Sequence, residues 1–364
     1  MITTCVLILK IYNIFMLNFT FIKTEDESIG LFNPEVNDIY HSKFGAKEES
    51  YEKFILPSGI LNHAKENNSV KILDICFGVG YNTKTSLYHL VKVNPNINIK
   101  VDAIESDKNT ILFSPFIKDS INDEELNLYL LMNIIESGIF DLDYVYEVLN
   151  FAVNEYKEVL NGLGILYLKN YQIDGCNSSS KVNKMTFLHN IYYQYVSNSI
   201  KIGQKLNKYQ KCAIKWLVND SRIGINDTTS HYDFIFLDAF TPEKDPTLWT
   251  VDFLNLIKNR MHKNSVLVTY SISAAFRAEL LELGFYVGKI LKEENQIGTI
   301  ASFNKNKIFD QLSEHDLNLL KTNAGIFYRD SKLNSSNDEI LNNRKNELKN
   351  SDRISTTKFL KSCR

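Results

Sequence analysis

The sequence feature that most constrains the fold of this chain begins at Lys71. It is a strand followed by a glycine turn, a helix and a second strand. The first strand, turn and helix are KILDICFGVGYNTKTSLYHLVK, and the next apolar strand is INIKVDAIESD. A strand followed by a helix and another strand forms a β-α-β unit, in which the strands lie parallel and the helix covers one face of the sheet. The chain is therefore predicted to build a parallel α/β sheet.

A second series of such units begins near residue 213. Its strands are AIKWLVND, YDFIFLDAF, NSVLVTYS, FYVGKIL and IGTIASF, with a helix from Ala274 to Leu283 after the third strand. Together the two series supply five or more strands. We therefore predict an α/β fold with a doubly wound, mostly parallel, Rossmann-like sheet.

The segments around this core complete the predicted organisation. Two short strands around a polar turn at residues 25–28 predict an N-terminal β-hairpin, and apolar residues at helical spacing before residue 212 predict a helical insertion. Ser313 and Asp316 have capping-box spacing, which predicts a helix followed by a solvated polar tail. The predicted parts are a non-native extension (1–15), a hairpin and entry segment (16–60), the core (61–114 and 213–303), the insertion (115–212), and a C-terminal helix and tail (304–364).

The opening apolar run and the composition bear on the compartment. The run is interrupted by Lys10, Asn13 and Asn18 and lacks a basic start and a cleavage site, so we favour Met16 as the true start over a signal peptide or membrane anchor. Five scattered cysteines without a CxxC pair argue against a zinc site and a disulfide framework. We predict a cytoplasmic protein with no metal and no membrane partner.

The turn after the first core strand is suited to a nucleotide-like ligand. Asp74 ends the strand, and Gly78 and Gly80 let the backbone pass close under a ligand at the helix N-terminus. Glu105 ends the next strand, where a carboxylate accepts both hydroxyls of a ribose. The alternatives are glycines needed only for the turn and a solvated acid. Thr83 stands where a dinucleotide fingerprint has its third glycine, which favours S-adenosylmethionine as the cofactor.

Two further strands end in acids at the same predicted edge. Asp220 follows WLVN, where it either contacts the adenine or forms a turn. Asp238 follows FIFL and is the catalytic candidate, because amine methylation needs a group that orients the nitrogen and takes its proton. Phe240 is placed to shield the sulfonium and stack on a base. The alternative is Asp238 as a helix N-cap with Phe240 in the core.

Several segments in order resemble the methyltransferase domain of the bifunctional tRNA 5-methylaminomethyl-2-thiouridine biosynthesis proteins, the MnmC family. They are DIYHSKFGAKEESYEKFI, ILDICFGVGYNT, NDSR, LDAFTPEKDPTLWT and VTYSISAAFRAELLELGFYV, about half the chain. Cys76 and Asn219 depart from usual glycines. The resemblance implies a Rossmann-like class I methyltransferase. It assigns a cofactor site and a methyl-transfer site of Asp238 and Phe240. The implied cofactor residues are Asp74, Gly78, Gly80, Glu105 and Asp220, joined by Tyr40, Ser42 and Glu49 of the entry segment.

The resemblance also implies a substrate. The expected reaction converts 5-aminomethyl-2-thiouridine, or its oxygen analogue, to the methylaminomethyl form at the tRNA wobble position. Bifunctional relatives expose the amine with a flavin-dependent oxidase domain, and no second GxGxxG follows the methyltransferase region. We therefore expect a separate oxidase or an ammonium-dependent route to supply the substrate. The alternatives are an aminopropyl transferase, whose usual carboxylate-rich groove is not evident, and a non-catalytic Rossmann module that binds RNA or a partner.

Charge is segregated in the predicted insertion although the whole chain is nearly neutral, with 41 basic and 43 acidic residues. No acid occurs between Gly175 and Asn219, while lysines recur there among tyrosines. The lysines are Lys181, Lys184, Lys201, Lys205, Lys208, Lys211 and Lys215. They are candidates to hold the tRNA backbone. The alternative is a basic face docked on the acidic segment 119–147.

Overall fold

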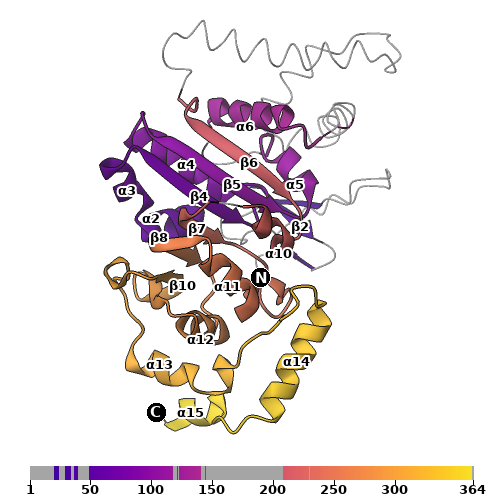
Figure 1. Ribbon diagram of the computed structural model, residues 1–364, viewed down its shortest axis with the longest axis vertical. Helices are drawn as coiled ribbons and strands as arrows, with labels where there is room; N and C mark the ends of the chain where they lie inside the picture. Colours follow the sequence, from indigo (N-terminus) through magenta and orange to yellow (C-terminus); the bar gives the residue numbers. More distant parts are fainter. Residues whose placement is uncertain are drawn as a thin grey trace, which may run out of the picture.

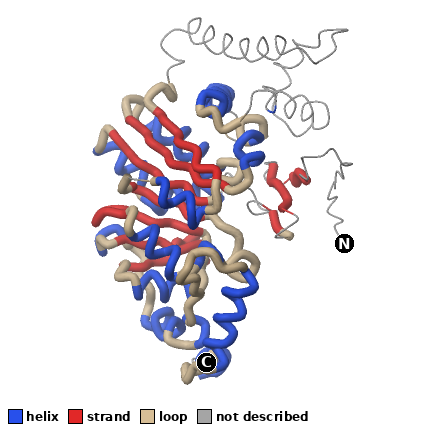
Figure 2. The backbone as a smooth tube through the Cα atoms, turned by 45° about the vertical axis from the view of Figure 1, so that its right-hand side comes forward, coloured by secondary structure: helices blue, strands red, loops and turns tan. Residues whose placement is uncertain are grey.

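The computed structural model describes residues 20–23, 29–33, 37–39, 49–117, 121, 123–140, 144, 208–228 and 230–362. Within these ranges the strands form one large and one small sheet, which Figures 1 and 2 show as separate units. Predictions for residues 1–15, for Tyr40 and Ser42, and for most of the insertion lie outside the described residues.

The large sheet has seven strands in the order β6-β5-β4-β7-β8-β10-β9. Their bounds are β4 (Ser69–Ile75), β5 (Asn98–Glu105), β6 (Cys212–Val218), β7 (Tyr232–Leu237), β8 (Met261–Thr269), β9 (Tyr286–Lys292) and β10 (Asn295–Ser302). The pairs β4·β5, β4·β7, β5·β6 and β7·β8 are parallel, whereas β10 runs antiparallel to both its neighbours. The predicted doubly wound, mostly parallel sheet is confirmed.

Two hydrophobic cores lie on opposite faces of this sheet because side chains alternate along each strand. In β4, Val70 and Ile72 belong to one core, and Leu73 and Ile75 to the other. The helices packed in the first core are α3 (Ile60–Glu66), α4 (Tyr81–Val93), α5 (Lys108–Phe113) and α6 (Glu124–Glu136). Those of the second are α11 (Val251–Lys258) and α12 (Ala274–Glu282). Helices therefore cover both faces, and the carboxyl ends of the central strands are left for a site.

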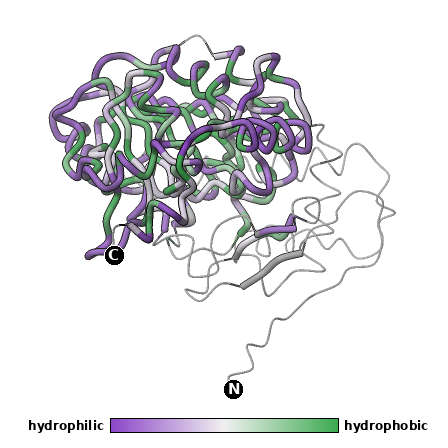
Figure 3. The backbone as a smooth tube through the Cα atoms, turned by 90° about the horizontal axis from the view of Figure 1, so that it is seen from below, coloured by the Kyte–Doolittle hydropathy of each residue, from purple (hydrophilic) through white to green (hydrophobic). Residues whose placement is uncertain are grey.

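The remaining short helices lie between the longer elements along the chain. They are η1 (Tyr51–Ile55), α2 (Leu56–Ser58), α10 (Ser221–Gly224), η2 (Ile225–Asp227), η3 (Thr247–Trp249), η4 (Lys305–Lys307) and η5 (Asn323–Gly325). Figure 3 shows hydrophobic stretches of the chain gathered inside the molecule and hydrophilic ones along its outside. No helix in the described ranges combines the length and the apolar character that crossing a membrane requires.

The small sheet lies near the N-terminus and consists of β1 (Thr20–Lys23), β2 (Ile29–Asn33) and β3 (Asp38–Ile39), all antiparallel. The predicted hairpin is confirmed by β1 and β2. An ion pair of 2.9 Å between Lys244 Nζ and Asp38 Oδ2 ties the small sheet to the loop after β7. Of the predicted insertion, the structure describes α6, whose apolar residues pack on the large sheet as their helical spacing indicates.

The C-terminal part differs from the predicted polar tail. Helix α13 (Glu314–Leu320) begins with the expected capping box of Ser313 and Asp316. Two more helices follow, α14 (Asn337–Lys349) and α15 (Thr356–Ser362); in Figure 1, α14 runs to the right of α12 and α13, and α15 lies below them. Helix α14 is anchored by Ile340, which is fully buried against Ala275 and Tyr328. A single buried apolar residue in an Asn- and Lys-rich stretch is too weak a pattern to predict this helix.

Candidate active site

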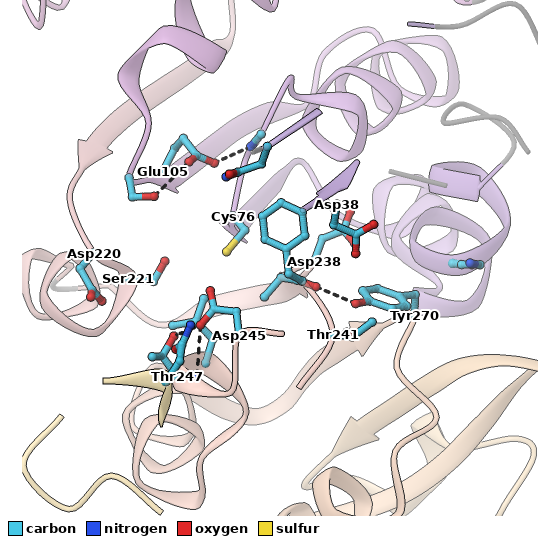
Figure 4. A pocket seen from close by; sticks show the side chains of 18 of the residues that line it. Asp38, Cys76, Glu105, Asp220, Ser221, Asp238, Thr241, Asp245, Thr247 and Tyr270 are labelled. Atoms are coloured by element: carbon cyan, nitrogen blue, oxygen red, sulfur yellow. Dashed lines mark hydrogen bonds between the residues drawn. The ribbon is translucent and has the colours of Figure 1, made fainter. Parts of the chain in front are cut away.

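A cavity of about 560 Å³ opens at the carboxyl ends of the central strands. Its lining residues are Asn33, Asp38, Glu49, Lys53, Cys76, Gly78, Glu105, Ser106, Asp220, Ser221, Asp238, Ala239, Phe240, Thr241, Asp245, Thr247, Leu248, Tyr270 and Asn337. Figure 4 shows Glu105 and Asp220 toward one end, and Asp38, Asp238 and Tyr270 toward the other. An open α/β sheet binds ligands at this position.

Two residues of the glycine turn after β4, Cys76 and Gly78, line the cavity, whereas Gly80, a predicted cofactor residue, does not. Cys76, Gly78 and Gly80 all have positive φ, at 66°, 56° and 84°. A Cβ atom at Gly80 would lie 2.3 Å from the Phe77 ring and 2.8 Å from Ser114 Oγ, so no larger residue fits without a shift. The backbone turns tightly here into α4, as predicted. Cys76, where a glycine is usual, adopts the left-handed conformation that glycine favours.

Glu105 joins the end of β5 to this turn. Its Oε2 accepts a hydrogen bond from Gly78 N at 2.7 Å, and its Oε1 accepts one from Asp107 N at 2.9 Å. Burial raises the pKa of Glu105, while these backbone donors act against the rise. The carboxylate therefore lies at the cavity wall with its orientation fixed by backbone groups. The solvated-acid alternative does not describe it, because Glu105 is only 4% exposed.

Asp74 lies beneath the turn and does not line the cavity. It is fully buried, and its Oδ2 accepts a hydrogen bond of 2.6 Å from Thr83 Oγ1. Burial raises its pKa to about 7. Its Oδ1 has no hydrogen-bond partner among the described residues. The structure thus places Asp74 as a support of the glycine turn, a layer below the cavity wall.

Asp220 lies at the cavity wall and at the start of a helix, while its contact with the adenine stays a prediction. It lines the cavity and caps α10, accepting a hydrogen bond of 2.8 Å from Arg222 N. Arg222 also forms ion pairs of 2.7 Å with Asp220 and 2.8 Å with the buried Asp330. Hydrogen bonds from Arg222 lower the pKa of Asp220, although burial opposes them. Ser221, the next residue, also lines the cavity.

Asp238 and Phe240 both line the cavity just past the end of β7. Asp238 Oδ2 accepts a hydrogen bond of 2.8 Å from Asn82 Nδ2, and Asp238 N donates to Ile75 O at 3.2 Å. Phe240 O accepts a hydrogen bond of 2.6 Å from Trp249 Nε1. The next two helices among the described residues, η3 and α11, have Pro246 and Thr250 at their N-caps. The alternative of Asp238 as an N-cap with Phe240 in the core is therefore not what the structure shows.

The entry segment reaches the cavity through Glu49 and Asp38. Glu49 forms an ion pair with Lys53, one turn along. Asp38 is the first residue of this segment, and nothing in the sequence predicted it as a site residue. Tyr40 and Ser42 lie outside the described residues, so their predicted roles stay predictions.

The cavity is more acidic than the sequence indicated. Of its described lining residues, six are acidic and one, Lys53, is basic. The six are Asp38, Glu49, Glu105, Asp220, Asp238 and Asp245. Sequence analysis found no carboxylate-rich groove because these acids come from separate elements of the chain. Such a wall favours a ligand with positive charge.

Three other contributors were missed. Tyr270 follows β8 and donates a hydrogen bond of 2.8 Å to Ala239 O, which supports the loop that carries Asp238. Burial raises the pKa of Tyr270, so the hydroxyl keeps its proton. Asn337 reaches the cavity from the start of α14, and Asp245 from the loop after β7. The position of Tyr270 after a strand was a usable signal, whereas nothing near Asn337 indicated a site.

The described lysines of the acid-free stretch make contacts within the chain. Lys208 Nζ lies 2.5 Å from Asp123 Oδ2 and 3.8 Å from Glu125 Oε2, at the start of α6. Lys211 and Lys215 donate to the backbone oxygens of Asn96 and Asp227. For Lys208, this contact agrees with the alternative interpretation, in which the basic stretch docks on the acidic segment 119–147. In the described ranges, no group of three or more His, Cys, Asp or Glu side chains forms a candidate metal site.

Comparisons with known proteins agree with this geometry. Residues 183–298 match a family described as S-adenosyl-L-methionine-dependent methyltransferase. An MnmC2 crystal structure from Aquifex aeolicus is 26% identical, with a TM-score of 0.64 over 93% of this chain and 88% of that one. An uncharacterised protein of Methanocaldococcus jannaschii is 28% identical over 89% of this chain and 70% of its own length.

The match to a bifunctional relative covers a smaller share of both chains. The tRNA 5-methylaminomethyl-2-thiouridine biosynthesis bifunctional protein MnmC of Leptospira interrogans is 21% identical over 70% of this chain. The match spans 31% of that protein's length. The similarity to this bifunctional protein is therefore confined to part of it.

Proposed function

Because the chain contains an MnmC-like, S-adenosylmethionine-dependent methyltransferase domain, we propose that it methylates the primary amine of 5-aminomethyl-2-thiouridine at the tRNA wobble position. The observation that carries the proposal is the placement of Asp238 and Phe240 in an acidic cavity at the end of β7. A carboxylate beside an aromatic ring suits a substrate that combines an amine with a base.

The residues at the other end of the cavity fit the cofactor. The groups there are the carboxylate of Glu105, at the end of β5, and the backbone of Gly78, which has no side chain to occupy the cavity. Glu105 would accept ribose hydroxyls, and Asp220 or Ser221 would meet the adenine. When bound, S-adenosylmethionine supplies an electrophilic methyl group on a positively charged sulfur. The acidic wall lowers the energy of that positive charge.

The proposed role of Asp238 follows from the chemistry of amines. A primary amine near pH 7 is an ammonium ion, which the acidic wall attracts but which has no lone pair for attack. Asp238 would accept an N–H hydrogen bond, aim the nitrogen and receive the proton that the amine loses. Phe240 would then pack against the base. Tyr270 contributes by fixing the backbone of Ala239, next to Asp238.

The proposed tRNA contacts are the lysines of the acid-free stretch. Phosphate contacts release counterions, so replacing Lys201, Lys205, Lys208 and Lys211 together by alanine should raise the tRNA Michaelis constant and flatten its salt dependence. Cofactor affinity should not change. Because Lys208 pairs with Asp123, the single variant Lys208→Ala is the matched control, and it should affect stability more than salt dependence. Unaltered salt dependence in the quadruple variant would favour the intramolecular interpretation.

The acidic cavity also favours a second candidate, an aminopropyl transferase, because a polyamine substrate carries several positive charges. The two functions differ in the donor. Incubation with S-adenosylmethionine or with its decarboxylated form, each with a polyamine and with tRNA, separates them by the product formed. Calorimetry with S-adenosylmethionine tests the non-catalytic alternative, in which no binding is expected.

The proposed reaction is tested with two tRNA preparations, one carrying the aminomethyl group and one the carboxymethylaminomethyl group. Each is incubated with enzyme and S-adenosylmethionine, and its nucleosides are analysed by mass spectrometry. Only the aminomethyl form should gain the mass of one methyl group. No reaction on that form would contradict the substrate assignment. Conversion of the carboxymethylaminomethyl form without an oxidase would show a broader activity than proposed.

A further inference from the structure

The geometry points to Asn82 as a positioning residue for Asp238, an inference that rests on the proposed function of Asp238 in methyl transfer. Asn82 is the second residue of α4, and its Nδ2 donates a hydrogen bond of 2.8 Å to Asp238 Oδ2. Asn82 is absent from the residues that line the cavity, whereas Asp238 is among them. Asn82 therefore acts on the site through Asp238.

The turn before α4 determines where the Asn82 amide lies. Gly80, in the left-handed conformation, starts the helix, and Phe77 and Ser114 pack where its Cβ would be. This packing leaves the turn little freedom, so the first turn of α4 stays at the end of β7. Asp238 N is held separately by Ile75 O, at 3.2 Å. The backbone contact places the residue, and the Asn82 amide sets the direction of its carboxylate.

The cost of burying Asn82 argues against a purely structural role. Asn82 is 3% exposed, and its Oδ1 has no hydrogen-bond partner among the described residues. Burying an acceptor without a donor is unfavourable, so packing of the helix alone does not favour an amide at this position. The favourable contact that remains is the hydrogen bond to Asp238. A donated N–H stabilises the ionised carboxylate, which is the form that accepts a proton from the amine.

The neighbours of Asp238 increase the need for such a donor. Asp74, Cys76 and Tyr270 all interact electrostatically with Asp238. Asp74 is a fully buried carboxyl whose pKa is raised to about 7, first by burial and in part by the charge of Asp238; like charges favour protonation of one partner. The uncharged amide of Asn82 offsets this repulsion without neutralising the acidic wall that attracts the substrate.

The test compares Asn82→Leu with Thr85→Val on the same helix. Thr85 is also fully buried, and its Oγ1 likewise has no partner among the described residues, so it is a matched control away from Asp238. Thr85→Val should unfold at or above the wild-type temperature, because it removes an unsatisfied polar atom. Asn82→Leu also removes the hydrogen bond to Asp238, so its unfolding temperature should lie close to or below that of the wild type. Asn82→Leu should slow single-turnover methyl transfer about tenfold to a hundredfold, the scale of a lost hydrogen bond to a charged group. S-adenosylmethionine affinity should stay within about threefold, and Thr85→Val should match wild type.

A second readout does not depend on the substrate. Carbon-13 NMR of labelled aspartate, assigned with Asp238→Asn, follows the Asp238 carboxyl as pH changes. Its pKa should rise in Asn82→Leu and rise further in the near-isosteric Asn82→Asp, which sets two carboxyls side by side. An unchanged Asp238 pKa in both variants would overturn the inference, as would normal turnover. A shifted pKa without methylation of aminomethyl tRNA in wild type would instead contradict the proposed substrate and leave the Asn82 coupling in place.

Discussion

The two ends of the cavity hold their carboxylates in different ways. At the end of β5, Glu105 accepts hydrogen bonds from the backbone N–H groups of Gly78 and Asp107. At the end of β7, Asp238 accepts one from the side chain of Asn82. A carboxylate held by the backbone depends on the path of the chain, whereas a carboxylate that accepts from a side chain depends also on the identity of that side chain. Substitutions should therefore harm folding and cofactor binding at the first end, and turnover at the second.

The largest expected effect comes from a substitution that disturbs the backbone conformation of the glycine turn. Gly80→Ala puts a Cβ 2.3 Å from Phe77 at a φ of 84°. The steric clash and the positive φ should together cost about 2–4 kcal/mol of unfolding free energy. Denaturant unfolding and cofactor calorimetry should both show the loss. A stable Gly80→Ala protein with normal affinity would mean that the turn is not rigid.

The next largest effect is expected at the other end of the cavity, at Asp238. Asp238→Asn keeps the size of the side chain but removes the proton acceptor, so turnover should fall on the order of 100-fold or more. S-adenosylmethionine affinity, measured by calorimetry, should be retained. If affinity and turnover fall together, Asp238 belongs to the cofactor end and the comparison fails.

The prediction for Glu105 is of intermediate size. Glu105→Ala should weaken S-adenosylmethionine binding by about 1.5–3 kcal/mol, the range for a hydrogen bond to a charged group. It also removes the acceptor of Gly78 N, so some loss of stability should accompany it. Calorimetry beside thermal unfolding separates the two contributions. Unchanged affinity would mean that the ribose is held elsewhere.

The smallest effect concerns Cys76. Its φ of 66° is unfavourable for a side chain, so Cys76→Gly should raise the unfolding free energy by less than about 1 kcal/mol. Turnover should fall far less than in Asp238→Asn, because Cys76 lines the cavity but the proposed chemistry does not use its thiol. Thermal unfolding measures the change. A clear loss of stability would show that side-chain contacts of Cys76 outweigh its backbone strain.

The sequence was sufficient for the sheet and for four of the proposed site residues at strand ends, because both depend on local alternation and on where strands stop. Glu105, Asp220, Asp238 and Phe240 reach the cavity as expected. Asp74 does not, because its side chain points to the face that α4 covers, where Thr83 binds it. Asp38 and Asn337 join the wall through contacts between distant segments, which no local pattern encodes, whereas Asp245 comes from the loop that carries Asp238.

Arg222 forms ion pairs with both Asp220 and Asp330, and the ribosome synthesises Asp330 long after the other two residues. A ribosome that has passed Ser302 has supplied every strand of the large sheet, but neither Asp330 nor Asn337. The nascent sheet would then have Asp220 and Arg222 without the buried acid that holds them. Ligand binding to an emerging chain should therefore lag behind formation of its sheet. Stalled chains that end before and after α14 would report this delay by their protection from proteolysis when S-adenosylmethionine is added.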